Sequence, residues 1–137
     1  MDSFAIFKVS ASALDAQRGR MNTIASNMAN IHSTQTESGG PYKRKDVVFS
    51  TLPIDPGRSS ALEGVKLVQV VESQEPFKKI YDPGHPDADK DGFVSLPNIN
   101  IMEEMVNMMM AVRAYEANVT TFNMSKSMFL KALEIGR

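Results

Sequence analysis

The strongest constraint on this chain is the uneven placement of proline and glycine along its 137 residues. All 7 Pro and six of the 8 Gly lie within residues 32–98, and the flanking segments 1–31 and 99–137 contain only Gly19 and Gly136. Because proline and glycine are the residues least compatible with a helix interior, long helices are confined to the two ends. We therefore divide the chain at these boundaries into an N-terminal helix, a central insert and a C-terminal helix.

The N-terminal segment carries an apolar stripe at alternating spacings of three and four residues. The stripe comprises Phe4, Phe7, Ala11, Leu14, Arg18, Met21, Ala25 and Met28. This spacing is typical of a helix that packs along a heptad-like seam, and about 28 helical residues would span roughly 42 Å. Arg18 is the charged exception, and we expect its side chain to reach solvent or a partner's carboxylate.

The C-terminal segment shows the same spacing over a greater length. Its stripe comprises Ile101, Met105, Met108, Val112, Tyr115, Val119, Phe122, Lys126, Phe129 and Leu133. Asn100 and Glu103 have the spacing of a capping box, which predicts that a helix of about 35 residues begins here.

Further apolar residues surround much of this predicted helix. They include Met102, Met109, Met110, Ala117, Met124, Met128 and Leu130. A helix that is apolar on most sides is buried on several sides, whereas one antiparallel partner covers a single stripe. The pattern favours contacts with further chains, and a single intramolecular core filled by flexible methionines is the alternative.

The central insert alternates short β-like runs with turn residues. Residues 47–52, 65–71 and 77–81 are predicted strands, separated by clusters of Pro, Gly and Asp. Both predicted terminal helices far exceed the usual helix length of about 11–12 residues, so the insert at residues 32–98 is too small to cover both of them. We predict a mainly α fold, in which two long terminal helices form a coiled-coil-like pair or bundle with a small, loop-rich β insert.

An acidic stretch in the insert begins like an EF-hand calcium loop. Asp87, Asp89 and Asp91 are spaced two apart, and Gly92 follows them. The twelfth position, which should supply a bidentate Glu, is Asn98, and the Pro-containing segment before the stretch cannot form the entering helix. We interpret the stretch as a polar turn leading to the last helix, and calcium binding there as the less favoured alternative.

Composition argues against several classes of function. The chain has no Cys, which excludes disulfides and thiolate metal sites, and its net charge of -1 gives no general attraction to nucleic acid. We interpret the basic run at residues 43–45 as a solvated loop or strand edge. Because His32 and His85 lie far apart and suggest no catalytic set, we predict no enzyme activity, metal, cofactor or small-molecule substrate.

The N-terminus does not resemble a cleaved secretion signal. Asp2 occupies the region that should be basic, and Lys8 interrupts a very short apolar run. No apolar stretch approaches the roughly 20 residues of a membrane-spanning helix. We therefore expect neither signal cleavage nor a membrane span.

Three stretches together resemble the flagellar axial proteins. Their asparagine-rich signature and the run that follows it are similar to the stretch from residue 21, MNTIASNMANIHSTQTESGGPYKRK. The match departs at one point, where an extra pair, His32 and Ser33, precedes Thr34. NINIMEEMVNMMMAVRAYEANVTTFN, from residue 98, resembles their second signature, and HPDADKDGFVSLPNIN, from residue 85, resembles the linker before it. The resemblance covers essentially the whole chain, with the stretches in the expected order.

The resemblance implies a structural subunit of the proximal rod of a bacterial flagellar basal body. Such subunits are exported unfolded by the flagellar type III machinery without a cleaved signal, and stack helically through their terminal helices into a rod that spans the periplasm and transmits torque. The implied partners are other copies, other rod proteins and the basal-body base with its export apparatus. A sibling rod or hook component is the alternative, although hook-type members carry much larger inserts.

The expected assembly interface draws on both stripes and both signatures. Its residues are Phe7, Leu14, Met21, Met28, Asn27, Asn30, Met105, Met108, Val112, Arg113, Tyr115, Val119, Phe122 and Phe129. We expect the apolar members to pack within and between chains. Asn27 and Asn30 either bond to a neighbour or simply end the first helix, and Arg113 and Tyr115 either bridge subunits or form an ordinary surface Arg and core Tyr.

Overall fold

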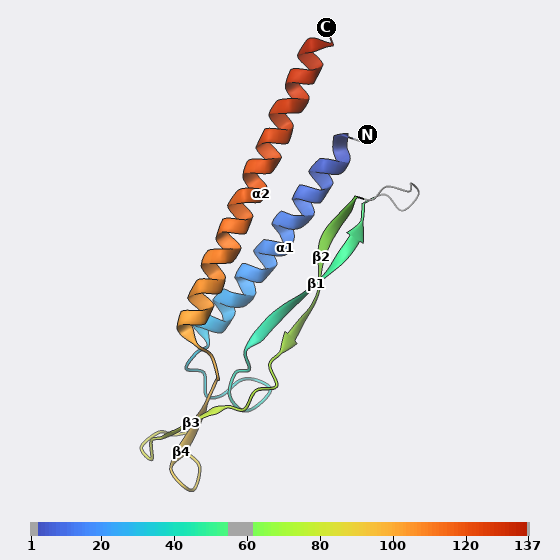
Figure 1. The fold of residues 1–137 in the computed structure, drawn as a ribbon. Helices are drawn as coiled ribbons and strands as arrows, with labels where there is room; N and C mark the ends of the chain where they lie inside the picture. Colours follow the sequence, from blue (N-terminus) through green and yellow to red (C-terminus); the bar gives the residue numbers. More distant parts are fainter. Residues whose placement is uncertain (1–2, 55–61, 137) are drawn as a thin grey trace.

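The computed structural model describes residues 3–54 and 62–136, and two long helices dominate it (Figure 1). Helix α1 (Ser3–Ala29) and helix α2 (Ile101–Ile135) lie side by side, with the chain termini toward the same end, so the two helices run antiparallel. At 1.5 Å per residue, α2 is roughly 52 Å long. This arrangement confirms the predicted mainly α fold with long terminal helices.

Local sequence fixes the start of α2. Asn100 has extended backbone angles (φ -95°, ψ 110°), and its side chain accepts a hydrogen bond from the backbone N of Met102 at 3.1 Å. The side chain thereby satisfies a donor that the first helical turn leaves unpaired. Glu103 lies in this first turn, where the helix dipole favours a negative charge. The predicted helix start is therefore confirmed.

The central insert forms two separate antiparallel sheets of two strands each. Strands β1 (Lys45–Pro53) and β2 (Glu63–Glu72) form the longer sheet, with one shift of register. Strands β3 (Lys78–Tyr81) and β4 (Phe93–Leu96) form the shorter one. The three predicted strands correspond to β1, β2 and β3. The prediction missed β4, because four residues are too few to show an alternation and its pairing partner lies across a long turn.

The acidic stretch forms the loop between β3 and β4. The Asp89 carboxylate accepts hydrogen bonds from the backbone N of Asp91 at 3.0 Å and of Phe93 at 2.8 Å. Gly92 has a φ of 80°, a value that favours glycine, and its carbonyl accepts a hydrogen bond from the backbone N of Asp82 at 2.9 Å. A carboxylate here satisfies the backbone of its own loop, as the polar-turn interpretation predicts.

Other side chains of this region make contacts unrelated to a calcium loop. Asn98, at the twelfth position, donates to Glu75 Oε2 at 3.1 Å, and Asp87 accepts a hydrogen bond from Thr34 Oγ1 at 2.8 Å. Across residues 3–54 and 62–136, no group of three or more His, Cys, Asp or Glu is placed to hold a metal ion. These contacts instead tie the β3–β4 loop and its exit to neighbouring loops.

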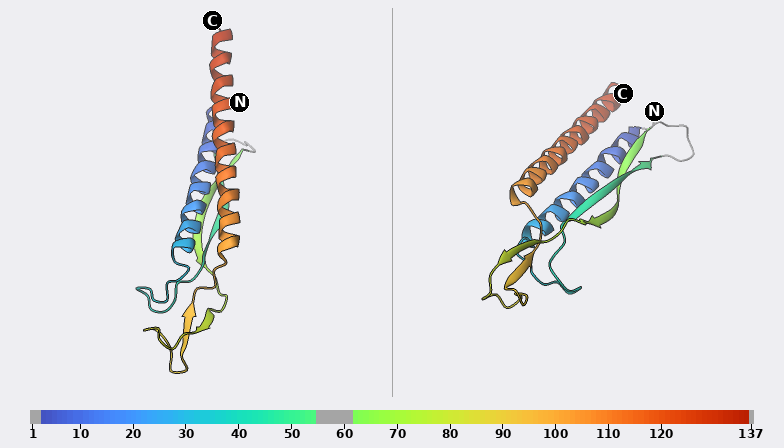
Figure 2. Two further views of the ribbon diagram at one scale, coloured as in Figure 1. Left: turned by 90° about the vertical axis from the view of Figure 1, so that its left-hand side faces the viewer. Right: turned by 60° about the horizontal axis from the view of Figure 1, so that its bottom comes forward.

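Helix α1 lies between α2 on one side and the β1–β2 sheet on the other (Figures 1 and 2). The β3–β4 sheet extends beyond the start of α2, and it packs against no other helix or strand of the described chain.

The described residues whose apolar side chains are buried are few and mostly small: Ala5, Ala16, Ile24, Tyr42, Val94 and Ala111. None of the described helices is both long and apolar enough to cross a membrane.

The β1–β2 sheet approaches α1 closely at two glycines. A Cβ at Gly19 would lie 2.7 Å from Leu67 Cδ1, and a Cβ at Gly64 would lie 2.6 Å from Ser12 Oγ. Ser12 Oγ also accepts a hydrogen bond from the backbone N of Val65 at 3.1 Å. Gly19 therefore weakens α1 locally, but it provides the room in which the sheet docks.

We expect Gly64→Ala to destabilise the docking of the sheet on α1 by about 1–3 kcal/mol, because the added methyl group would overlap Ser12. Gly84→Ala is the matched control, since a Cβ there meets nothing closer than 3.6 Å. Thermal unfolding of both variants beside the wild type, at a concentration that favours assembly, measures the difference. If Gly64→Ala unfolded at the wild-type temperature, the close approach would not be required.

Candidate assembly surface

A cluster of buried and half-buried polar side chains joins α1, α2 and the segment that leads into β1. We call this cluster, formed by Asn27, Tyr42, Arg44 and Glu104, the polar clamp. Asn27 is 0% exposed and Glu104 is 1% exposed. Polar groups that are buried this deeply require hydrogen-bond partners, so the side chains of the polar clamp must bond to one another or to nearby backbone.

Asn27 is the centre of the polar clamp. Its side-chain oxygen accepts hydrogen bonds from Tyr42 OH at 3.1 Å and from the backbone N of Lys45 at 2.9 Å. Its side-chain nitrogen donates to the Lys45 carbonyl at 2.7 Å and to Glu104 Oε2 at 3.1 Å. One amide thus binds both the start of β1 and the start of α2. Asn30, in contrast, donates to a carbonyl in the last turn of α1 at 2.8 Å and closes that helix.

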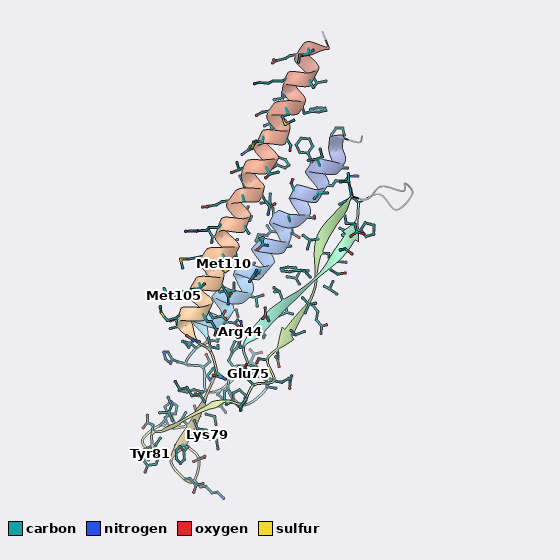
Figure 3. The ribbon with its side chains drawn as sticks, in the orientation of Figure 1. Arg44, Glu75, Lys79, Tyr81, Met105 and Met110 are labelled. Carbon is teal, nitrogen blue, oxygen red and sulfur yellow. The ribbon has the colours of Figure 1, made fainter. Side chains whose placement is uncertain are left out.

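Arg44, which is labelled in Figure 3, supplies the positive charge that balances the buried Glu104. Its Nε donates to Glu104 Oε1 at 2.8 Å, and its Nη1 lies 3.3 Å from Asp46 Oδ2. Burial alone would lower the pKa of Arg44, but the hydrogen bond and charge of Glu104, with those of Asp46, outweigh burial and raise it. The guanidinium therefore stays charged. The interpretation of residues 43–45 as a solvated loop or strand edge is therefore wrong for Arg44, whereas Lys43 is exposed and Lys45 begins β1.

At the opposite end of the helix pair, aromatic rings pack between α1 and α2. The ring centroids of Phe7 and Phe122 are 5.1 Å apart, those of Phe4 and Phe129 are 6.1 Å apart, and those of Phe7 and Phe129 are 6.5 Å apart. Ala111 is buried between these two ends, and its small side chain allows the two helices to approach closely. The aromatic contacts and the polar clamp together fix the register of α1 against α2.

The structure divides the predicted interface residues into two groups. Asn27 is buried, and the half-buried members are Phe7, Leu14, Met21, Met28, Asn30, Met108, Tyr115, Val119, Phe122 and Phe129. Met105, Val112 and Arg113 are exposed on α2. The face that α2 turns to its own chain is offset from the predicted stripe, because its buried residues are Glu104 and Ala111. Neither is a large apolar residue, so the stripe could not reveal them.

The stripe on α1 also differs from the face buried within the chain. Every second member of it is exposed: Phe4, Ala11, Arg18 and Ala25. Arg18, expected at solvent or at a partner, forms an ion pair with Asp15 of the same helix at 2.6 Å, and both side chains remain largely exposed. The stripe thus marks an edge of α1 that its own chain covers only partly.

The side of α2 that α1 leaves uncovered carries a long series of exposed apolar residues, which we call the apolar arc. Its members are Met102, Met105, Val106, Met109, Met110, Val112, Met124, Met128 and Leu130. At about 100° per residue, they occupy one continuous half of the helix surface, and Figure 3 shows Met105 on the side away from α1. A polar belt divides the arc; it consists of Arg113, Glu116, Thr120 and Asn123.

Comparison with known proteins shows similarity along nearly the whole chain. The family model described as "Flagella basal body rod protein" matches residues 7–35, and "Flagellar basal body rod FlgEFG protein C-terminal" matches residues 90–135. The flagellar basal-body rod protein FlgC of Salmonella typhimurium is 46% identical over 132 residues, 96% of each chain. Those of Bacillus subtilis and Borreliella burgdorferi are 41% and 40% identical over 100% and 98% of each chain. The first match covers most of α1 and the residues after it, and the second covers β4 and α2.

Proposed function

Since the chain belongs to the FlgC family of flagellar basal-body rod proteins, we propose that it builds the proximal part of the rod through the exposed faces of its terminal helices. It is a structural rod subunit. In the proposed assembly it acts without catalysis. It transmits torque because the polar clamp holds α1 and α2 together at one end of their contact and the aromatic rings hold them at the other.

The apolar arc carries this proposal. Met102, Met109 and Met128 are 67%, 56% and 69% exposed, and they recur along almost the full length of α2. Single exposed apolar residues are ordinary, but two apolar patches on the same side of one helix, separated only by the polar belt, mark an interaction site. The described α1 and β strands cannot cover this face, because they pack on the opposite side of α2 or do not touch it. Neighbouring subunits are the covering group that we propose.

The proposed contacts are heterologous, with one face of a subunit meeting a different face of the next. When the rotation between successive subunits does not close a ring, such contacts generate an open helical polymer. Methionine suits the covering surface because its flexible side chain adapts to neighbours that are not identical. We propose that these neighbours are other copies of the chain, other rod proteins and the base of the basal body.

The proposed location is the rod segment that spans the periplasm, reached through the type III export machinery without cleavage of a signal. Two properties support it. The chain has no Cys, so it forms no wrong disulfides in an oxidising compartment. Its small set of buried apolar side chains also gives the single chain little stability, which suits passage in an unfolded state.

A concentration series tests the proposed function. We expect the dilute purified chain to show weak helical circular dichroism, because too little apolar surface is buried to offset the entropy of ordering two long helices. Helicity should rise together with sedimentable mass as concentration increases or rod partners are added. A dilute chain that is fully helical and monodisperse would contradict the proposal.

A further inference from the structure

The polar belt contains two opposite charges that have no ion-pair partner in the described part of the chain. Arg113 and Glu116 are both exposed, and within residues 3–54 and 62–136 neither forms a salt bridge. They are three positions apart on one helix, but the basic residue comes first, which is the less favourable order for pairing along a helix. Their charges are therefore available to another chain.

The surroundings of these charges demand a specific partner. Met109 and Met110 precede the belt and Met124 follows it on the same arc, so a helix that covers the arc also covers the belt. A charge that is removed from water without a counter-charge is strongly unfavourable. The covering surface must therefore present an acidic group to Arg113 and a basic group to Glu116.

We propose that copies of this chain supply both groups to each other, with Arg113 of one copy pairing with Glu116 of the next. Three residues correspond to about 300° around a helix, so the two side chains project about 60° apart and toward different flanks of α2. Each copy thus has a basic flank and an acidic flank, and the pairing repeats along an open series of identically oriented subunits. This inference rests on the proposed function, since it requires the apolar arc to be covered by another subunit.

Charge reversal in living cells tests the pairing. Arg113→Glu and Glu116→Arg are expressed separately in a flagellated strain that lacks its own copy, and incorporation into purified basal bodies is measured by quantitative immunoblotting. Each variant alone juxtaposes like charges at every contact between copies, so we expect incorporation to fall at least about tenfold. When the two variants are co-expressed, the carboxylate introduced at position 113 of one chain can meet the guanidinium introduced at position 116 of the other, and the unchanged Arg113 and Glu116 also meet. We therefore expect incorporation to return to within about twofold of wild type.

Four further variants keep the outcomes separate. Lys66→Glu and Glu63→Lys reverse exposed charges on β2 and should incorporate normally. The double variant Arg113→Glu/Glu116→Arg should also recover. If the double variant recovers while co-expression does not, Arg113 and Glu116 pair within one helix. If neither recovers, the partner is not a second copy. Both results overturn the inference, and so would normal incorporation of the single variants. Met109→Glu tests the arc itself, so its normal incorporation would instead contradict the proposed function.

Discussion

Replacing Glu104 with alanine is expected to raise the concentration required for assembly by at least about a hundredfold. Removing one partner of a buried ion pair costs about 3–5 kcal/mol, and each 1.4 kcal/mol corresponds to a tenfold change. The change would leave Arg44 with Asp46 alone and would remove one hydrogen-bond acceptor from Asn27. The start of α2 would then no longer be held to α1 and β1. Sedimentation across a concentration series measures the effect.

Glu103→Ala is the matched control for this prediction. Glu103 adjoins Glu104 in the sequence but is exposed, so its removal should change the assembly concentration by less than about threefold, a small surface effect. Glu104→Gln should fall between the two, because an amide oxygen still accepts from Arg44 but carries no charge. Assembly of Glu104→Ala at the wild-type concentration would show that the polar clamp does not couple the helices.

Replacing Met109 with glutamate is expected to abolish sedimentable assembly and to leave the chain in its weakly helical, dilute state. Met109 is more than half exposed, so the substitution removes little packing within the chain. In an assembled rod, however, the carboxylate would be buried on the apolar arc. If it paired with Arg113, four residues further on, it would take that cation from the neighbouring subunit, so one buried carboxylate would stay unpaired at a cost of several kcal/mol. Light scattering and circular dichroism on the same samples report the two expected losses together.

Two further variants separate loss of the arc from a general effect of added charge. Val68 on β2 is 58% exposed, comparable to Met109, so Val68→Glu introduces the same charge away from the arc and should assemble normally. Met109→Leu keeps an apolar side chain of similar volume and should also assemble. If Met109→Glu assembled like Val68→Glu, the exposed methionines would not form the interface.

The polar clamp shows where sequence reasoning reaches its limit. The asparagine-rich signature identifies Asn27 as a candidate, but its side-chain partners Tyr42 and Glu104 are 15 and 77 residues away in the chain. No local pattern links them to it, and a half-buried Arg44 looks identical in sequence to a solvated arginine. A glutamate in the first turn of a helix is explained equally well by the helix dipole. Only the packed helices reveal that Glu104 is buried.

Local patterns in the sequence were enough to predict the two long helices, the cap at Asn100, the insert between the helices and the excess of apolar surface on α2. Each of these follows from properties that act over a few residues, namely breaker placement, side-chain period and capping chemistry. The face that α2 turns to α1 emerges only in the folded chain, because burial of Glu104 and Ala111 depends on contacts between distant segments. The same holds for the apolar residues that remain uncovered, since a period locates a stripe but does not show which partner, within the chain or outside it, covers that stripe.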